Sequence, residues 1–313
     1  MGSLGIDKNI ESVPAFKGCY NTGMPKIWIN GTFVNSSEAS VSVFDHGLLY
    51  GDGCFEGIRI YNGRIFKLKS HLRRMFDSAQ SIRLNPGYSI EEIESAVRET
   101  VELNKQLNGY IRLVFTRGTG TLGLNPFLCP TPTIFIIAND ISLYADELYE
   151  QGMPIIVAKR PRVPIECLNP AVKSLNYLNN ILAKIEAIDA GVMEALMLNV
   201  EGEVAECTGD NIFIVNDGAI STPPLAAGIL NGITRDYVIS HICPGLGYSV
   251  KERSVSLDDL KAADEVFLTG TAAEIIGVNT IDDAVIGDGN VGKITRALAE
   301  DFRGRVATDA PED

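Results

Sequence analysis

The chain has 313 residues, of which 45% are hydrophobic and 21% charged, enough to form the cores of two domains of ordinary size. Its net charge of -13 argues against a nucleic-acid partner or an anionic membrane surface, because both favour a basic face. Six cysteines without a CxxC pair and only three histidines predict free thiols in a reducing compartment and no metal centre. The polar start of the sequence and the lack of a long apolar run predict a cytoplasmic protein without a membrane span.

The first half of the sequence predicts short strands, then two helices, then two more strands. Asn30-Gly31 and Asn62-Gly63 are hairpin-turn dipeptides between β-rich runs. Ser70 and Ser89 are the predicted N-caps of helices over 71–84 and 90–106. Strands are expected over 110–118 and 133–140. The pattern breaks at 138–150, which indicates a hinge.

The second half predicts strands with intervening helices. The segment 175–191 has apolar residues at helical spacing and ends on Gly191, which predicts an amphipathic helix. We expect strands over 154–160, 194–199, 204–209, 211–217, 218–222 and 265–271, and helices over 232–246 and 291–302. The pattern predicts an α+β fold with domains over 1–140 and 151–313, joined by a loop over 141–150. The cleft between the domains is the expected ligand site.

Two glycine-rich segments resemble nucleotide-binding loops but lack the required context. The segment 118–123 (GTGTLG) satisfies GxGxxG, yet the prolines that follow cannot open the helix that would hold a pyrophosphate. The segment 287–293 (GDGNVGK) is nearly a Walker A loop, but Ile294 stands where Ser or Thr must reach Mg²⁺. The first therefore predicts no dinucleotide site, and the second predicts a surface turn before the last helix.

Other residues meet the needs of pyridoxal 5′-phosphate (PLP), which requires a lysine, an acid at its ring nitrogen and donors for its phosphate. Lys173 follows an apolar segment at the mouth of a helix, where partial burial would free its amine. Glu206 ends a strand before Thr208-Gly209 and could keep the ring nitrogen protonated. Taken singly, Lys173 could equally be a loop lysine, and Glu206 could cap its own turn.

Three features could bind the phosphate. Gly232-Ile233-Thr234 opens a helix whose free N–H groups point at one spot. The turn Gly270-Thr271-Ala272 ends a strand and adds a hydroxyl and further N–H donors. Arg59 can supply a bidentate positive charge. Such turns are common, so none of these features is specific by itself.

Six segments, taken in order, resemble the fold-type IV PLP enzymes, and most closely the branched-chain amino acid aminotransferases. The resemblance spans roughly residues 26–290 and implies a small N-terminal α/β domain and a larger C-terminal pseudo-barrel domain. It also implies a homodimer or a higher homo-oligomer, with the active site completed across the interface. The matching segments are 45–61 (DHGLLYGDGCFEGIRIY), 110–112 (YIR), 173–180 (KSLNYLNN), 201–213 (EGEVAECTGDNIF), 228–236 (GILNGITRD) and 268–275 (LTGTAAEI).

The resemblance implies a role for each matching residue. Lys173 would be the Schiff-base lysine and would carry the proton between the substrate Cα and C4′ of the cofactor, while Glu206 would pair with the ring nitrogen. The other implied roles are the phosphate for Arg59, Ile233, Thr234 and Thr271, a ring face for Leu230, the phenolic oxygen for Tyr177, and the substrate α-carboxylate for the backbone of Thr271 and Ala272. Cys207 stands where the family usually has glycine, which bears on local packing more than on chemistry. Asp45 and His46 are expected to be structural.

The YIR segment bears on the substrate. In branched-chain enzymes the matching tyrosine and arginine help to hold the distal carboxylate of glutamate, which implies that role for Tyr110 and Arg112, with Tyr50, Phe55 and Tyr177 as apolar walls. Arg117 stands where D-amino acid aminotransferases hold the α-carboxylate, but Thr119 replaces the histidine of those enzymes. The favoured reaction is ping-pong transfer between L-branched-chain amino acids and 2-oxoglutarate through pyridoxamine phosphate. D-amino acid and R-selective amine aminotransferases and aminodeoxychorismate lyase stay open as alternatives.

Overall fold

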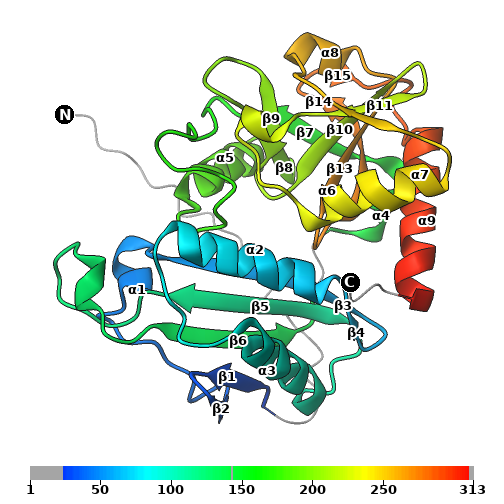
Figure 1. The fold of residues 1–313 in the computed structure, drawn as a ribbon. Helices are drawn as coiled ribbons and strands as arrows, with labels where there is room; N and C mark the ends of the chain where they lie inside the picture. The colour runs from blue at the N-terminus through cyan, green and yellow to red at the C-terminus, as the bar shows by residue number, and fades with distance from the viewer. Residues whose placement is uncertain (1–23, 142–143, 310–313) are drawn as a thin grey trace.

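The computed structural model describes residues 24–141 and 144–309, which form two domains, each built around its own β-sheet (Figure 1). In the small domain, α2 and α3 pack on one face of a six-stranded sheet and form a single core with it. The sheet order is β2 (Thr32–Asn35), β1 (Lys26–Ile29), β6 (Thr133–Asn139), β5 (Gly109–Thr116), β3 (Gly53–Tyr61) and β4 (Arg64–Ile65). The helices are α1 (His46–Tyr50), α2 (Leu68–Ser81), α3 (Ile90–Leu103) and the short 3₁₀ helix η1 (Pro126–Leu128).

Strand β3 separates two environments because side chains alternate across a strand. The even-numbered residues, such as Ile58 and Ile60, face the core formed with α2. The odd-numbered residues Phe55, Gly57 and Arg59 lie on the other face. That face of the strand is therefore free to line a site.

Local signals explain most of the element boundaries in the small domain. Asn30-Gly31 and Asn62-Gly63 both turn with positive φ, as their hairpins require. Ser89 caps α3 and forms a reciprocal capping box with Glu92. The prediction for Ser70 is wrong: α2 begins at Leu68. The chain enters that helix through Lys67, two residues after β4, which adopts a left-handed conformation with φ of 51°.

The large domain is built on a curled nine-stranded sheet of mixed direction. Its order is β12 (Val250–Glu252), β11 (Ala219–Thr222), β10 (Asn211–Asn216), β13 (Glu265–Gly270), β14 (Glu274–Ile281), β7 (Met153–Val157), β8 (Glu194–Leu198) and β9 (Val204–Cys207), with β15 (Ala284–Val285) beside β14. Its helical elements are α4 (Asp146–Gln151), α5 (Leu178–Asp189), η2 (Leu225–Ala227), α6 (Ile233–Tyr237), the π-helix η3 (Val238–Ile242), α7 (Cys243–Gly245), α8 (Leu257–Lys261) and α9 (Lys293–Asp309).

Helix α5 differs from its prediction in two respects. It begins at Leu178 rather than at 175, because residues 173–175 pair with the start of β3 instead. Its apolar stripe also points outward: Leu178 is 65% exposed and Ile188 61% exposed, while Ala183 and Ala187 are buried. The buried face of α5 is thus built from small residues, and the large apolar ones are left on the surface.

The two glycine-rich segments behave as the sequence predicts. Residues 118–123 open no helix; the next helical element is the short η1, after two intervening residues. Residues 287–292 form a turn that leads directly into α9. The first segment therefore lacks the helix that a pyrophosphate site requires, and the second connects the short strand β15 to α9 without the Ser or Thr that would reach Mg²⁺.

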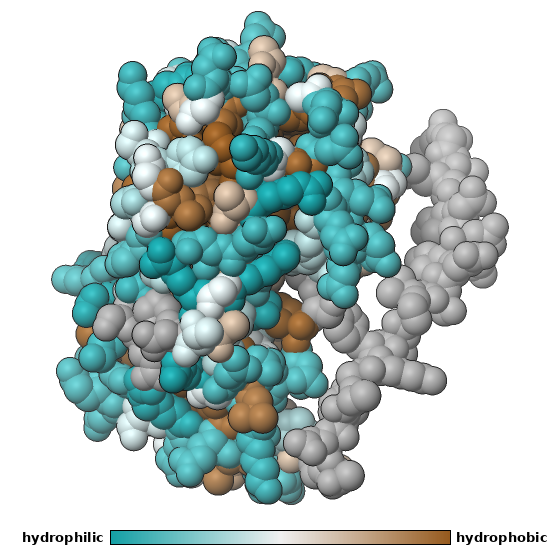
Figure 2. Space-filling model, turned by 90° about the vertical axis from the view of Figure 1, so that its right-hand side faces the viewer, coloured by the Kyte–Doolittle hydropathy of each residue, from teal (hydrophilic) through white to brown (hydrophobic). Residues whose placement is uncertain are grey.

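The two domains meet along the side of β3, and α9 also reaches the small domain. Asn62 and Arg64 of the β3–β4 hairpin donate hydrogen bonds to the carbonyls of Ala307 and Thr308. The predicted loop over 141–150 falls between β6 and β7 and includes most of α4. The face on the side of α7 and α9 is largely hydrophilic (Figure 2). Within residues 24–141 and 144–309, no helix is both long and apolar enough to cross a membrane.

Candidate active site

A cavity of about 270 Å³ lies between the two domains. The small domain contributes residues from α2, β3 and β5, and the large domain contributes the Lys173 loop and the turns after β9 and β13. The cavity thereby brings together residues that are far apart in the sequence, from Gly57 to Ala272. The sequence-predicted residues that line it are Tyr110, Arg112, Lys173, Glu206, Leu230, Ile233, Thr234, Thr271 and Ala272.

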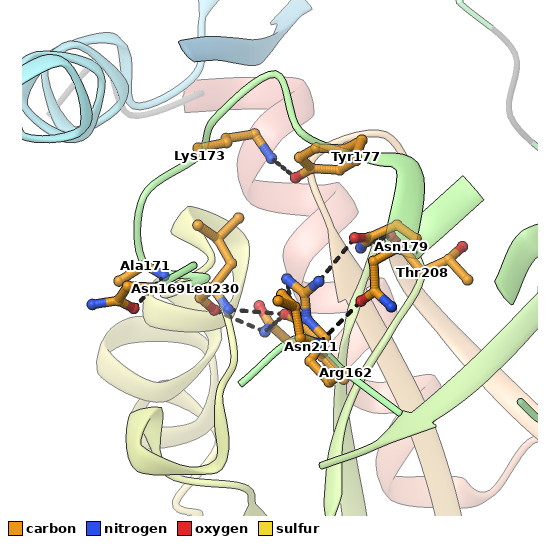
Figure 3. Close-up of polar contacts among 12 residues, drawn as sticks. Arg162, Asn169, Ala171, Lys173, Tyr177, Asn179, Thr208, Asn211 and Leu230 are labelled. Carbon is orange, nitrogen blue, oxygen red and sulfur yellow. Dashed lines mark hydrogen bonds and ion pairs between the residues drawn. The ribbon is translucent and has the colours of Figure 1, made fainter. Parts of the chain in front are cut away.

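Lys173 is held by strand-like pairing rather than by a helix. Its carbonyl accepts from the Phe55 N–H at 3.0 Å, and its own N–H donates to the Ser78 hydroxyl at 3.1 Å. The half-buried ammonium donates to the Tyr177 hydroxyl at 3.0 Å and lies 4.7 Å from the centre of the Phe55 ring. Figure 3 shows the Lys173 and Tyr177 side chains pointing toward each other, with Leu230 below them. The lysine is therefore aimed into the cavity by both domains.

Glu206 lies at the end of β9 in a buried set of donors. Arg162 approaches one carboxylate oxygen at 2.8 and 3.0 Å, and the other oxygen accepts from Asn211 at 3.1 Å and from the Leu230 N–H at 3.0 Å (Figure 3). Burial raises the pKa of Glu206 above its ordinary value, against the opposite pull of Arg162 and of the Leu230 N–H. A buried carboxyl of raised pKa is a basic partner for a protonated ring nitrogen.

A second region of the cavity offers donors for an anion. Helix α6 begins there, so the N–H groups of Ile233 and Thr234 have no partner within their own helix. Gly232 is required before them, because a Cβ at this position would collide with the Asn211 side chain. The Thr269 hydroxyl, which also lines the cavity, is buried and lacks a hydrogen-bond partner within the described residues. These groups suit a phosphate.

Arg74 of α2 reaches this same region, although no sequence motif pointed to it. It lines the cavity and donates to the Asn231 carbonyl at 2.7 Å, one residue before Gly232. Glu56, which is fully buried, fixes its orientation by accepting from Arg74 at 2.7 and 2.8 Å and from His71 at 2.7 Å. Burial raises the pKa of Glu56, but Arg74 and His71 outweigh it and hold that pKa below its ordinary value. Arg74 is thus a fixed cation at the anion end.

Arg59, by contrast, does not line the cavity. Its guanidinium lies 3.4 Å from the Glu274 carboxylate and donates to the Ala272 carbonyl at 3.3 Å. Both partners belong to the turn between β13 and β14. Of the two arginines, it is therefore Arg74 that adjoins the start of α6.

The opposite wall combines aromatic rings with one cation. Gly57 pairs with Arg112 across β3 and β5, and a Cβ on Gly57 would overlap the Tyr110 hydroxyl. The Arg112 guanidinium lies over the Phe55 ring at 4.5 Å and over the Tyr110 ring at 5.4 Å. No carboxylate of the described residues pairs with Arg112. This wall can accept an apolar chain and can also offer a charge to an anionic one.

Other residues singled out in the sequence also lie outside the cavity lining: Phe55 and Tyr177, which adjoin the Lys173 ammonium, and Arg117, Tyr50 and His46. Arg117 is buried and bound bidentately to Asp52, with both distances 2.9 Å, and it also donates to two carbonyls. Tyr50 is 37% exposed and donates to the Leu122 carbonyl. His46 is buried against the Thr121 carbonyl at 2.6 Å. Arg117 and His46 therefore have structural partners, while Tyr50 faces outward.

The remaining wall contains a buried acid pair that the sequence did not reveal. The Tyr144 hydroxyl lies 3.5 Å from Glu194 and 3.3 Å from Asp210. Burial and the neighbouring Glu194 raise the pKa of Asp210 to about 7. Cys207, which stands where glycine is usual, packs into the core of the large domain and pairs with Leu196; the register of β8 and β9 shifts only further along, between Met197 and Leu198.

Comparison with known proteins agrees with this arrangement. The family model for amino-transferase class IV matches residues 53–281, most of the chain. The chain belongs to the class IV aminotransferases. Enzymes of this family use PLP, so PLP is the cofactor of this class IV aminotransferase, and the donor set described above fits it: a lysine, a buried acid and an anion site around one cavity.

Two relatives and one solved structure illustrate the similarity. The putative branched-chain-amino-acid aminotransferase of Methanocaldococcus jannaschii is 52% identical over 278 residues, covering 89% of this class IV aminotransferase and 95% of the relative. The D-alanine aminotransferase of Staphylococcus haemolyticus is 38% identical over 281 residues, covering 89% and 97%. The crystal structure of the branched-chain aminotransferase from Thermoproteus uzoniensis with norvaline is 39% identical, with a TM-score of 0.85 and coverage of 92% and 97%.

Proposed function

We propose that the enzyme transfers the amino group between L-branched-chain amino acids and 2-oxoglutarate. The observation that carries the proposal is the wall of Gly57, Tyr110 and Arg112 in the cavity, backed by the Phe55 ring, which contacts both Arg112 and Lys173. An aminotransferase of this kind must accept an apolar side chain in one half-reaction and a carboxylate in the other. Aromatic rings beside a cation with no carboxylate partner in the described residues meet both needs.

The cofactor would be held at four points. Lys173 would carry it covalently, Glu206 would pair with the ring nitrogen, and Leu230 would pack on one ring face. We assign its phosphate to the start of α6, to Thr271 and to Arg59, whose buried Nε has no hydrogen-bond partner within the described residues, with Arg74 as a second cation beside Gly232. When bound, PLP supplies an electron sink that stabilises the negative charge left at the substrate Cα.

The residues of the chain move the proton and orient the substrate. The Lys173 amine, freed when the substrate amine takes its place, would accept the proton from the substrate Cα and deliver it to C4′ of the cofactor. Tyr177, at 3.0 Å, keeps that amine in place. The N–H groups of Thr271 and Ala272 would bind the α-carboxylate. The turn between β13 and β14 would thereby orient the Cα–H bond toward Lys173.

The two half-reactions would use one pocket in turn, as in a ping-pong cycle. Leucine, isoleucine or valine would contact only the aromatic wall, where one methylene changes binding by about 1–3 kcal/mol. All three should therefore react. Glutamate and 2-oxoglutarate would place their distal carboxylate on Arg112, assisted by the Tyr110 hydroxyl.

The D-amino acid alternative has support from the 38% identical D-alanine aminotransferase. It would need Arg117 to bind the α-carboxylate. That guanidinium is already occupied by Asp52 and by the carbonyls of Ile82 and Arg83. Releasing it would leave the buried Arg117 guanidinium without its carboxylate partner, which argues for the L-amino acid assignment.

We also propose a homodimer or higher homo-oligomer, located in the cytoplasm, with domains over 1–140 and 151–313 joined by 141–150. The support for association is the exposed apolar surface of α1, the segment 122–128 and the outer face of α5, where several large side chains are more than half exposed. Tyr50 is on this surface and does not line the cavity of its own chain. Its expected role as a substrate wall therefore requires a second copy.

The test follows the visible absorption of the PLP-loaded protein without any oxo acid. If L-leucine but not D-alanine removes the visible absorption band of bound PLP, and 2-oxoglutarate restores it, the proposal is supported. Loss with D-alanine alone would favour the D-amino acid alternative and reassign Arg117. No change with either would point to an amine substrate or to a lyase, to be tried with aminodeoxychorismate. Lys173→Ala is the control and should abolish every response.

A further inference from the structure

The turn that would bind the substrate α-carboxylate is closed by an unusual residue. Gly270 and Glu274 pair at the ends of β13 and β14, with Thr271, Ala272 and Ala273 between them. Glu274 adopts φ of 60°, a left-handed conformation that favours glycine in hairpin loops of this length. Strained positions of this kind are most often found at functional sites. A glutamate here therefore needs a reason that its carboxylate can supply.

That carboxylate is the meeting point of three other elements. The Tyr61 hydroxyl of β3 donates to one oxygen at 2.9 Å, and Arg59 of β3 lies 3.4 Å from the same oxygen. Arg303 of α9 lies 3.8 Å from the other oxygen and is half exposed. Glu274 itself is only 15% exposed. The two partners on β3 are thus the closer ones, and they belong to the other domain.

Arg59 contacts the turn at two places. Besides Glu274, it donates to the carbonyl of Ala272, on the opposite side of the turn, at 3.3 Å. Within the described residues, no backbone acceptor is paired with the N–H groups of Thr271 and Ala272. The Ala272 carbonyl of the turn is therefore hydrogen-bonded to Arg59, and the N–H groups of Thr271 and Ala272 are available to a ligand.

The same strand also carries the side-chain pocket. Arg59 pairs with Tyr110 and Gly57 with Arg112 in the β3–β5 register. A displacement of β3 relative to the turn would change the distance between the α-carboxylate donors and the aromatic wall. The contact of Arg59 and Tyr61 with Glu274 fixes that distance directly.

We propose that Glu274, held by Arg59 and Tyr61, is a positioning residue that sets the affinity of the Thr271–Ala272 turn for the substrate α-carboxylate. This rests on the proposed function, since it takes the ligand to be an amino acid or oxo acid. None of the three residues lines the cavity, so they act on the ligand only through the turn and the strand. Loss of the contact lets the turn relax, while Lys173 and the phosphate donors at the start of α6 stay in place.

The test measures binding of 4-methylpentanoate, which has the leucine side chain and a carboxylate but no amine, by its effect on the absorption of the PLP-loaded enzyme. We expect Glu274→Gln to raise the Kd about fivefold to tenfold, with Tyr61→Phe at the lower end. The KM for L-leucine should rise in parallel, and kcat should stay within about twofold of its wild-type value. The absorption spectrum of the holoenzyme without ligand should not change.

Glu252→Gln is the matched control, since it removes a carboxylate that pairs with Arg235 at 2.7 Å on the edge strand β12, away from the turn. It should leave the Kd unchanged. If Glu274→Gln does not fold, Tyr61→Phe carries the test, because it removes one hydroxyl and keeps the ring. A wild-type Kd in both variants, or equal changes in kcat and KM, would overturn this inference and leave the proposed function standing. Absence of 4-methylpentanoate and L-leucine binding by the wild type would overturn the proposed function and this inference with it.

Discussion

The electrostatics of the cofactor site can be tested by removing the cation beside Glu206. Arg162→Met leaves the carboxylate buried with two neutral donors, the Asn211 amide at 3.1 Å and the Leu230 N–H at 3.0 Å. Removing one partner of a buried ion pair costs about 3–5 kcal/mol, because the other charge stays buried. We expect the lower end, about 3 kcal/mol, since the two N–H groups still stabilise the charge.

The loss of folding stability caused by Arg162→Met should depend on pH in a defined direction. Burial already raises the pKa of Glu206, and without Arg162 less opposes that rise. A carboxyl whose folded-state pKa exceeds its unfolded value loses stabilisation as pH rises through that interval. The variant and the wild type should therefore differ most near neutral pH. They should differ least below about pH 4, where the carboxyl is protonated in both states.

Thermal unfolding of the cofactor-free protein measures this difference. With an unfolding entropy of about 2.1 cal/mol/K per residue, a loss of about 3 kcal/mol in a chain of 313 residues corresponds to a fall of about 5 °C in the melting midpoint at neutral pH. The double variant Arg162→Met/Glu206→Gln should recover most of the loss, because no charge is then left buried. An equal loss at both pH values, without recovery in the double variant, would refute the reasoning.

Other parts of the cavity make binding and pH dependence testable. Arg74→Lys keeps the charge but loses the planar fork, so PLP should dissociate about tenfold more readily on dialysis, and unchanged retention would contradict a role for Arg74 at the phosphate. Gly57→Ala places a methyl where the Tyr110 hydroxyl lies, so the KM for L-leucine should rise about tenfold in steady-state assays, and an unchanged KM would count against that pocket. The Asp210 carboxyl has a pKa of about 7 in the folded protein and near 4 in the unfolded chain, so the wild type loses stability as pH rises from about 4 to 7. Asp210→Asn has no such group and should therefore gain up to about 4 kcal/mol relative to the wild type over this range. Melting curves that stay parallel over that range would exclude a protonated Asp210.

Residues carried by sequence motifs could be predicted because each motif combines a turn with its functional side chain. Lys173, Glu206 and the start of α6 line one cavity, as their spacing and family resemblance indicate. Arg74 was missed although a signal exists. His71, Arg74 and Ser78 follow helical spacing beside the apolar stripe of α2, and polar residues on that face must have buried partners.

Other features could not be predicted, because they depend on contacts between distant segments. Arg162 lies in an irregular segment near two other basic residues, and no periodicity indicates which of them pairs with Glu206. The outward stripe of α5 looks like a core face in sequence, since hydrophobic spacing alone does not say which surface covers it. The acid pair Glu194 and Asp210 is separated by 16 positions and meets only because β8 and β9 form a hairpin.

The placement of the site on β3 separates folding from specificity. The even-numbered residues of this strand form the core and hold Arg74 through Glu56, so changes there affect stability and the anion site together. Its odd-numbered residues from Phe55 to Arg59 face the large domain and contact Lys173, Arg112 and Glu274 in succession. Because a strand alternates with a period of two, substitutions on the second set can reshape the substrate pocket without entering the core. Substrate differences among similar enzymes of this fold should therefore be sought first on the odd-numbered face of this strand and on its partner residues in β5.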